Sequence, residues 1–373
     1  MGLRETQAER DARHMRRALE LARKGSGRTR PNPAVGAVVV RRGHVVGEGF
    51  TQPAGGAHAE VQALAAAGAK ARGATLYCTL EPCSIVGRTG ACTQAIASAG
   101  IVRVVGGATD PNPRVRGRGF RALERNGIAV ERHVERDACD YQIRYFRKHI
   151  GTGLPFVRLK LATSLDGKIA TASGDSQWIT GAPARRLVHD WRNEMDAVMV
   201  GVGTVLADDP RLTARNRGGR DPIRIVVDSK LRTPPTAALL QNGTGQVIFA
   251  TTRAASVRRE KSLVAKGARV MRVAARAGRV DPKSLLRHLG KLDVVSVLCE
   301  GGAALAGSLM RAECVDEVAL FQAPVFIGGD GESMCGSLGV GTPAEGICLR
   351  DHKIELVGRD VLHQGRPVDQ GRK

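Results

Sequence analysis

Aromatic residues are scarce in this sequence, where Phe, Trp and Tyr together make up 3% of the 373 residues. Proteins that bind single-stranded nucleic acid stack bases on aromatic side chains, so this composition offers little for such stacking. The sequence also lacks an apolar run near the roughly 18 residues of a transmembrane helix, and runs such as residues 34–40 are short. We therefore expect a soluble chain that neither spans a membrane nor binds single strands.

Acidic residues are also few relative to basic ones. The sequence has 36 Asp and Glu against 57 Lys and Arg, which gives a formal net charge of +21 and a pI near 10.4. A basic surface favours anionic partners. Because aromatic residues are rare, we expect phosphorylated small molecules as partners rather than nucleic acid.

Cysteine is sparse as well, with eight residues in the whole chain. A disulfide-stapled secreted domain would need a higher density. The first residues also lack the apolar segment of a secretory signal. We therefore expect a cytoplasmic protein with reduced cysteines.

The length and the hydrophobic pattern predict two α/β domains. Apolar residues recur at helical spacing over residues 8–24 and are followed by a β-hairpin over 34–40 and 45–50. Helices and strands then alternate as in an α/β sandwich. Residues 151–155 contain two glycines and a proline, which break regular structure, so we expect domains at residues 1–150 and 151–373.

The second half repeats the alternation of strands and helices and includes a buried strand that runs into Glu300-Gly301-Gly302. A helical stretch over 137–148 precedes it, and residues 363–373 have the composition of a frayed polar tail. The expected strands and helices of this half are at residues 156–161, 183–193, 197–201, 223–228, 246–251, 294–299 and 303–310.

One set of residues in the first half has the composition of a catalytic zinc site. His58-Ala59-Glu60 opens a predicted helix, Cys83 follows Pro82, and Cys92 comes after a gap of eight residues. One imidazole and two thiolates give zinc three protein ligands and leave the fourth tetrahedral position for water, as catalysis requires. Glu60 is then placed to carry the proton from water to a leaving amine.

Each of these residues also has an ordinary structural interpretation. His58 could be a surface residue at a helix start, Glu60 a partner of the helix dipole, and the cysteines small core residues. Zinc deaminases usually have two residues between the cysteines, so the gap of eight indicates a subfamily with a longer loop. The remaining cysteines fall in or beside apolar segments, and we expect them in the core.

With its flanking motifs, the first half resembles the deaminase half of the bifunctional riboflavin-biosynthesis deaminase-reductases. The resemblance implies a cytidine-deaminase-like α/β/α sandwich, a phosphoribosyl pyrimidine substrate, and Asn32 and Arg88 as substrate contacts. It departs from the family at Ile85, where members commonly carry His, and at Gly90 and Ala91, where they carry Pro-Pro. The matching segments are Pro31-Asn32-Pro33-Ala34-Val35-Gly36, His58-Ala59-Glu60, Thr79-Leu80-Glu81-Pro82-Cys83, Gly87-Arg88-Thr89 with Cys92, and Asp110-Pro111-Asn112-Pro113.

Two glycine motifs in the second half are candidates for binding a dinucleotide. Gly201-Val202-Gly203 follows a predicted strand, but Leu206 stands where a Rossmann fingerprint needs Gly or Ala. Gly301-Gly302 precedes a predicted helix, whose N-terminus could bind a pyrophosphate, and a simple tight turn explains these glycines equally well.

The second half resembles the reductase half of the same family, which has a dihydrofolate-reductase-like fold and transfers hydride from NADPH to the ribose C1′. The matching segments are Lys160-Leu161-Ala162, residues 164–170, Gln177-Trp178-Ile179-Thr180, residues 200–210 and Glu300-Gly301-Gly302. The resemblance implies cofactor contacts at Ala162, Trp178, Thr204, Asp208, Gly302, Ala303, Ala304, Leu305, Ala306, Gly307 and Ser308. It implies substrate contacts at Lys160, Ser176, Arg192, Leu212, Arg215 and Glu300.

Three functions fit parts of these observations. The first is an enzyme that uses zinc to deaminate and NADPH to reduce a phosphoribosyl pyrimidine, without nucleic-acid or membrane partners. A nucleic-acid base deaminase would share the zinc motif but leaves the second half unexplained. A basic RNA-binding module with structural zinc would need a fourth protein ligand, and the motif offers none. A homo-oligomer is compatible with all three.

Overall fold

The computed structural model describes residues 5–85, 90–216 and 218–369. The chain divides into two compact units, Met1–Gly153 and Leu154–Lys373. The division falls inside the glycine- and proline-containing segment 151–155. Each unit has its own sheet and core, and each is described separately below.

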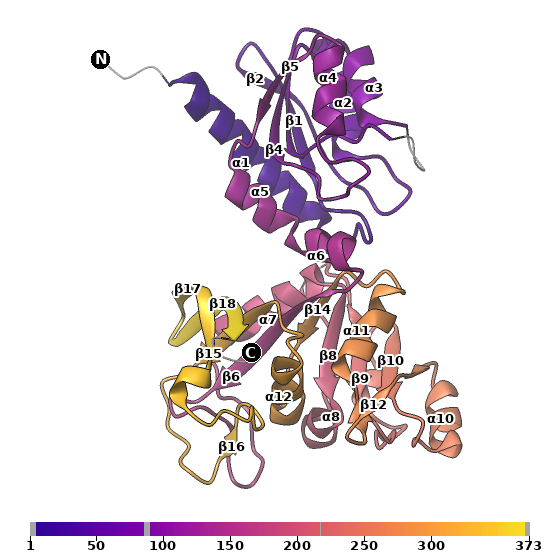
Figure 1. Ribbon diagram of the computed structural model, residues 1–373, viewed down its shortest axis with the longest axis vertical. Coiled ribbons are helices and arrows are strands. Elements are labelled where there is room, and N and C mark those ends of the chain that lie inside the picture. The colour runs from indigo at the N-terminus through magenta and orange to yellow at the C-terminus, as the bar shows by residue number, and fades with distance from the viewer. Residues whose placement is uncertain (1–4, 86–89, 217, 370–373) are drawn as a thin grey trace. The chain divides into compact units, whose positions relative to one another are not determined.

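The first unit is a five-stranded sheet between helices (Figure 1). The strand order is β2-β1-β3-β4-β5, with β1 antiparallel to β2 and β3 and the last three strands parallel. The elements are α1 (Gln7–Gly25), β1 (Gly36–Arg41), β2 (His44–Phe50), α2 (Ala59–Ala67), a 3-10 turn (Gly68–Ala71), β3 (Thr75–Leu80), α3 (Cys92–Ser98), β4 (Arg103–Ala108), α4 (Arg118–Arg125), β5 (Ala129–Arg132), α5 (Arg136–Gln142) and α6 (Arg144–Thr152).

The helices lie on two faces of this sheet: α1 and α5 on one, α2, α3 and α4 on the other (Figure 1). Thr6 starts α1 with a capping box, in which its hydroxyl accepts from the Glu9 N–H and the Glu9 carboxylate accepts from the Thr6 N–H. Glycine lets α1 approach β1 closely, because a Cβ on Gly36 would lie 1.9 Å from the Ala18 carbonyl oxygen. The contact buries Met15 and Leu19 in the core.

The second unit contains a nine-stranded sheet with the order β11-β10-β9-β8-β14-β6-β15-β18-β17. In this spatial order, each strand from β11 to β15 runs parallel to its neighbours. At the end of the sheet, β18 pairs antiparallel with both β15 and β17. The helices are α7 (Ala182–Glu194), α8 (Val202–Asp208), α9 (Ala238–Gln241), α10 (Val257–Val264), α11 (Pro282–Gly290), α12 (Ala303–Arg311) and a 3-10 turn (Pro343–Glu345). The strands are β6 (Phe156–Thr163), β7 (Lys168–Ala170), β8 (Ala197–Gly201), β9 (Ile223–Val227), β10 (Val247–Thr251), β11 (Arg269–Arg272), β12 (Ala275–Arg276), β13 (Arg279–Val280), β14 (Ser296–Cys299), β15 (Glu317–Gln322), β16 (Glu332–Ser333), β17 (Ile347–Val357) and β18 (Asp360–Asp369).

Two expectations about local structure were wrong, and a third was right only in part. The helical stretch expected over 137–148 is present, but it divides at Ile143 into α5 and α6, and α6 continues through Gly151 to Thr152. The expected tail forms β18 up to Asp369, because its backbone pairs with both β15 and β17. Cys348 is exposed on the edge strand β17, whereas Cys78, Cys139, Cys299 and Cys314 are buried.

No helix in the described part of the chain combines the length and apolar character needed to cross a bilayer.

Candidate active sites

The predicted zinc ligands come from three elements that end at one place in the first unit. His58 is the N-cap residue that directly precedes α2, and Cys92 is the first residue of α3. Cys83 follows β3 after Glu81 and Pro82. Within the described residues, His58, Cys83 and Cys92 form the one group of at least three His, Cys or acidic side chains close enough to share a metal.

The three ligand atoms are already arranged for one ion. The Nδ1 atom of His58 lies 3.2 Å from the Cys92 Sγ and 3.6 Å from the Cys83 Sγ, and the two sulfurs lie 3.4 Å apart. The contact with Cys92 lowers the pKa of Cys83, while the contact with Cys83 raises the pKa of Cys92. A neutral imidazole and cysteine sulfurs at this spacing suit zinc and leave one coordination position for water.

Glu60 is placed beside these ligands but does not belong to the group of three. It lies in the first turn of α2, and its side chain is buried. Burial raises the pKa of Glu60 to about 7. A carboxyl group with a pKa near neutrality can both accept and donate a proton, which is the behaviour of a general acid–base.

The other predicted contacts of the first unit are less fully placed. Asn32 is half-buried in the loop before β1, where its carbonyl accepts a hydrogen bond from the Thr29 hydroxyl at 2.9 Å. Ile85 follows the ligand segment and is 40% exposed. Arg88 lies outside the described residues.

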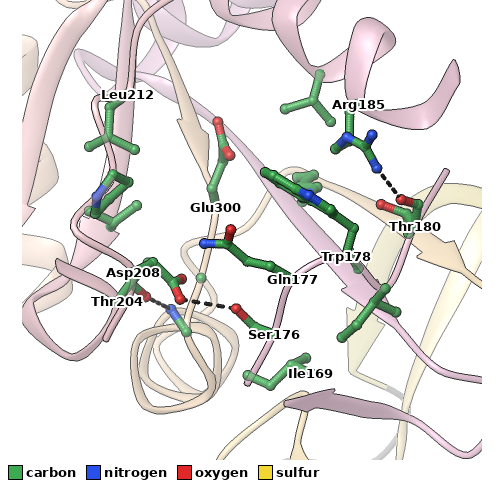
Figure 2. Close-up of a pocket in the computed structure, with 18 of the residues that line it drawn as sticks. Ile169, Ser176, Gln177, Trp178, Thr180, Arg185, Thr204, Asp208, Leu212 and Glu300 are labelled. Atoms are coloured by element: carbon green, nitrogen blue, oxygen red, sulfur yellow. Dashed lines mark hydrogen bonds between the residues drawn. The ribbon is translucent and has the colours of Figure 1, made fainter. Parts of the chain in front are cut away.

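The second unit has a cavity of about 890 Å³ that gathers most of the residues predicted for the reductase site (Figure 2). Glu300 directly follows β14, and Thr204 lies on α8 directly after β8, so neighbouring parallel strands deliver both to one edge of the sheet. The predicted residues that line the cavity are Lys160, Ala162, Ser176, Trp178, Arg192, Thr204, Asp208, Leu212, Arg215, Glu300 and Gly302.

A charged pair forms part of the cavity wall. Arg192 donates two hydrogen bonds to the Glu300 carboxylate, at 2.6 and 2.7 Å, and a third to the Thr213 carbonyl at 3.0 Å. Burial opposes ionisation of Glu300, but the guanidinium outweighs it and lowers the pKa of that carboxyl. Burial lowers the pKa of the neighbouring Lys160. The arrangement fixes charged and polar groups in the wall of the cavity.

A second part of the cavity lies at the start of α12. Gly302 is the N-cap residue that precedes this nine-residue helix, and its N–H donates to the Thr204 hydroxyl at 3.0 Å. A Cβ on Gly302 would lie 3.3 Å from that hydroxyl, so glycine allows this close approach to Thr204. The Trp178 ring is 63% exposed and lies 4.5 Å from the Arg185 guanidinium carbon, which gives a flat surface for an aromatic ring.

Not all residues of the predicted cofactor segment line this cavity. Of residues 302–308 only Gly302, which precedes α12, does so, while Ala303, Ala304 and Ser308 lie on the helix. The side chains of Leu305 and Ala306 belong to the hydrophobic core. Gly307 packs against another segment, because a Cβ there would lie 2.9 Å from the Gly336 carbonyl oxygen. The start of the helix therefore lines the cavity, while residues further along it pack against the rest of the unit.

The sequence analysis missed two cavity residues that a helical pattern would have found. Arg185 and His189 line the cavity from α7, seven and three residues before Arg192 respectively. Residues at this spacing share one helix face. Burial lowers the pKa of His189, and Arg192 and Arg215 add to the effect.

The two units and their sites define a class of protein, a zinc-dependent deaminase joined to a reductase. The "Cytidine and deoxycytidylate deaminase zinc-binding region" matches residues 8–108, and the "RibD C-terminal domain" matches residues 155–363. The chain is 41% identical over 367 residues to the riboflavin biosynthesis protein RibD of Escherichia coli, covering 95% of this chain and 98% of that protein. The RibD of Bacillus amyloliquefaciens is 40% identical, with coverages of 95% and 96%.

Solved structures agree with this classification. RibD of Acinetobacter baumannii superposes with a TM-score of 0.86 at 36% identity, covering 97% of this chain and all of that one. A diaminohydroxyphosphoribosylaminopyrimidine deaminase/5-amino-6-(5-phosphoribosylamino)uracil reductase of Thermotoga maritima gives 0.84 at 35% identity, with the same coverages. The chain belongs to the RibD family of bifunctional riboflavin-biosynthesis deaminase-reductases.

Family membership confirms the predicted fold class, with a cytidine-deaminase-like first domain and a RibD-type reductase second domain. It confirms a bifunctional enzyme over a nucleic-acid base deaminase or an RNA-binding zinc module. Zinc is the metal of the deaminase domain, and NADPH is the cofactor of the reductase domain.

Proposed function

We propose that this chain performs two successive steps on one phosphoribosyl pyrimidine. The first unit hydrolyses an amino group of 2,5-diamino-6-(5-phosphoribosylamino)pyrimidin-4-one, and the second reduces the ribosyl group of the product to a ribityl chain. The observation that supports this most directly is the group of His58, Cys83 and Cys92 beside buried Glu60. The same chain carries a cavity in which Arg192 and Glu300 form a fixed charged pair.

In the deamination, Glu60 takes a proton from the attacking water and delivers it to the departing amine, so that water enters and ammonia leaves. Zinc, when bound by His58, Cys83 and Cys92, supplies a Lewis acid next to this carboxyl. Burial keeps the pKa of Glu60 near neutrality, so that both proton transfers are accessible to one group. We propose Asn32 and Arg88 as substrate contacts of this unit.

In the reduction, residues of the second unit bind and orient the two reactants. NADPH, when bound, supplies the hydride. We propose that Gly302, Thr204, Asp208, Ala162 and Trp178 hold the cofactor. Substrate would be held by Lys160, Ser176, Arg192, Leu212, Arg215 and Glu300. Hydride transfer needs no protein nucleophile, so orientation and neutralisation of phosphate are the main tasks of these groups.

The test is to incubate the zinc-loaded protein with the diaminopyrimidinone ribosyl phosphate, with and without NADPH, and to follow products by mass spectrometry. We expect exchange of amino for oxo without NADPH, and addition of two hydrogens only when NADPH is supplied. If deamination fails while the deaminated substrate is still reduced, the deaminase function of the first unit is contradicted. If deamination occurs but no reduction follows with NADPH, the reductase function of the second unit is contradicted.

We further propose that the enzyme is a cytoplasmic homo-oligomer that acts on small molecules and not on nucleic acid. Zinc binding requires Cys83 and Cys92 in the reduced form, and the described cysteines are free. Thiols are kept reduced in the cytoplasm, which supports this location. The edge strand β17 exposes Ile354 by 64% and Leu356 by 74%, which supports pairing with a second copy. Light scattering of wild type and an I354K/L356K variant tests this: a monomeric wild type would contradict the proposal.

A further inference from the structure

Two histidines meet on the C-terminal hairpin of the second unit. The hairpin consists of β17 and β18, which pair antiparallel at the edge of the nine-stranded sheet (Figure 1). The Nε2 atom of His352 on β17 lies 3.2 Å from the Nδ1 atom of His363 on β18. Neither residue belongs to the zinc group of the first unit, and neither lines the cavity of the second. The pair is therefore a separate cluster of nitrogen donors.

An irregularity in the pairing of the hairpin accompanies this contact. The register of β17 against β18 shifts between Arg350 and Lys353, so that Asp351 and His352 stand opposite the single residue Gly365. Glycine makes room for the extra residue, because a Cβ on Gly365 would lie 3.0 Å from the Arg350 carbonyl oxygen and 3.5 Å from the Cα of His352. Bulges of this kind change the direction in which a side chain points. The meeting of the two rings thus depends on a specific feature of the backbone.

The residues paired with His363 in the sheet are uncharged. His363 lies between Leu320 of β15 and Ile354 of β17. Side chains of a strand alternate between its two faces, so Lys353 projects to the face opposite that of Ile354. Burial lowers the pKa of His363, and the nearby His352 adds to the effect. A lowered pKa favours the neutral imidazole, which is the form that binds a metal ion.

The separation of the two nitrogens suits a shared metal ion. In the zinc group of the first unit, the Nδ1 atom of His58 and the Sγ atom of Cys92 are also 3.2 Å apart. Two nitrogens 3.2 Å apart and each about 2.1 Å from one ion subtend an angle of about 100° at that ion. This angle lies between the roughly 90° of square-planar or octahedral sites and the roughly 109° of tetrahedral ones. Imidazole ligands select Zn²⁺, Ni²⁺ or Cu²⁺, whereas Ca²⁺ and Mg²⁺ prefer oxygen.

We propose that His352 and His363 together bind one divalent transition-metal ion, in addition to the zinc of the deaminase domain. Binding replaces the contact between the two rings and leaves the remaining positions of the ion to water. The ion joins β17 to β18 across the irregular register, and so stabilises the hairpin in the folded chain. This site is independent of the proposed enzymatic function, because neither histidine takes part in either reaction.

Isothermal titration of the zinc-loaded protein with Ni²⁺ tests the proposal on the wild type, H352Q, H363Q and a matched H44Q/H133Q control. His44 begins β2 and His133 follows β5, and both are exposed. These are the two edge strands of the first sheet, so the control removes two histidines that lie apart. We expect one Ni²⁺ per wild-type chain. The Kd should rise at least about 100-fold in H352Q and in H363Q, because the second imidazole of the pair binds intramolecularly.

A colorimetric indicator measures any zinc released during the titration, which separates a new site from exchange at the deaminase site. A wild type that binds no Ni²⁺ beyond the amount of zinc released would overturn the proposal by itself. Unchanged binding in H352Q or H363Q would also overturn it, as would an equal loss in H44Q/H133Q. One ion per two chains would place the metal between copies and contradict chelation within one chain. Without Ni²⁺, both enzymatic activities of H352Q and H363Q should equal those of the wild type.

Discussion

Glu60 is the residue on which deamination depends most directly. Replacing it with Gln removes the proton carrier but keeps nearly the same volume in a buried position. We expect the deamination rate of E60Q to fall at least about 100-fold, which is the usual contribution of a general acid–base. Zinc content, measured by atomic absorption, and the reductase rate should stay at wild-type values. Loss of the reductase rate in a folded E60Q protein would show that the two sites are not independent.

Glu81 organises the segment that carries the ligand Cys83. Its buried carboxylate accepts hydrogen bonds from the N–H groups of Asp110, Gly117 and Gly119, at 3.2, 2.9 and 2.8 Å. We expect E81A to lower the free energy of unfolding of the first unit by about 3 kcal/mol, because buried N–H groups lose a charged acceptor. Urea unfolding with a circular dichroism readout measures this. A change below about 0.5 kcal/mol would contradict it.

Asp166 links its own loop to a distant segment and gives a pH-dependent prediction. The Ser164 hydroxyl, helped by the N–H groups of Gly328 and Ile327, lowers the pKa of Asp166 to about 2. An unfolded Asp titrates near 3.9. The stabilisation is therefore complete above about pH 4 and is lost as the pH falls toward 2.

We expect the difference in unfolding free energy between wild type and D166A to be constant from pH 7 to 5 and to shrink between pH 4 and 2. Denaturant unfolding at a series of pH values measures it. A difference that persists at pH 2 would show that Asp166 acts through packing rather than through its charge.

At the scale of elements, the C-terminal strand supports the helix that carries the cavity arginines. Asp360 begins β18 and is fully buried, and its carboxylate accepts from the Gly181 N–H at 2.7 Å. Gly181 is the N-cap residue that directly precedes α7, and Arg185 and Arg192 of that helix line the cavity. The contact joins residues 179 positions apart and fixes where that helix begins.

We therefore expect D360A to raise the reductase KM for substrate several-fold, because the α7 side chains lose their fixed position. Deamination by the first unit should be unaffected. Steady-state kinetics of both reactions on one preparation tests this, and D360N, which keeps an oxygen acceptor, should recover part of the loss. Equal behaviour of D360A and wild type would mean that β18 pairing alone holds the helix.

At the scale of the whole molecule, two compact units carry separate chemistry on one chain. Removal of zinc by a chelator should abolish deamination and leave reduction of the deaminated substrate intact. NADPH at 100 times its Kd should stabilise the second unit by about 2.7 kcal/mol and leave the first unchanged. Calorimetry of the protein with and without zinc and NADPH measures both effects. A shift of both unfolding transitions by either ligand would show that the units unfold together.

Much of the site was predictable because its signals are local in the sequence. The types of the zinc ligands are visible in three short stretches, His58-Ala59-Glu60, Pro82-Cys83 and Cys92. The helix predicted to start at His58 indicated that Glu60 lies beside the metal. The order of strands and helices followed from hydrophobic spacing, which depends on neighbours a few residues apart. The tail that became β18 was missed because pairing with β15 and β17 is not encoded in the composition of residues 363–369.

The sequence by itself thus determined the chemistry of the metal site and the α/β class of both units, since residue types and short spacings decide these. Only the tertiary structure decided which distant residues meet. Arg192 reaches Glu300 across 108 positions, and the Asp360 carboxylate accepts from the Gly181 N–H across 179 positions. Such contacts depend on how the strands order themselves in a sheet, and no local pattern of side chains specifies that order.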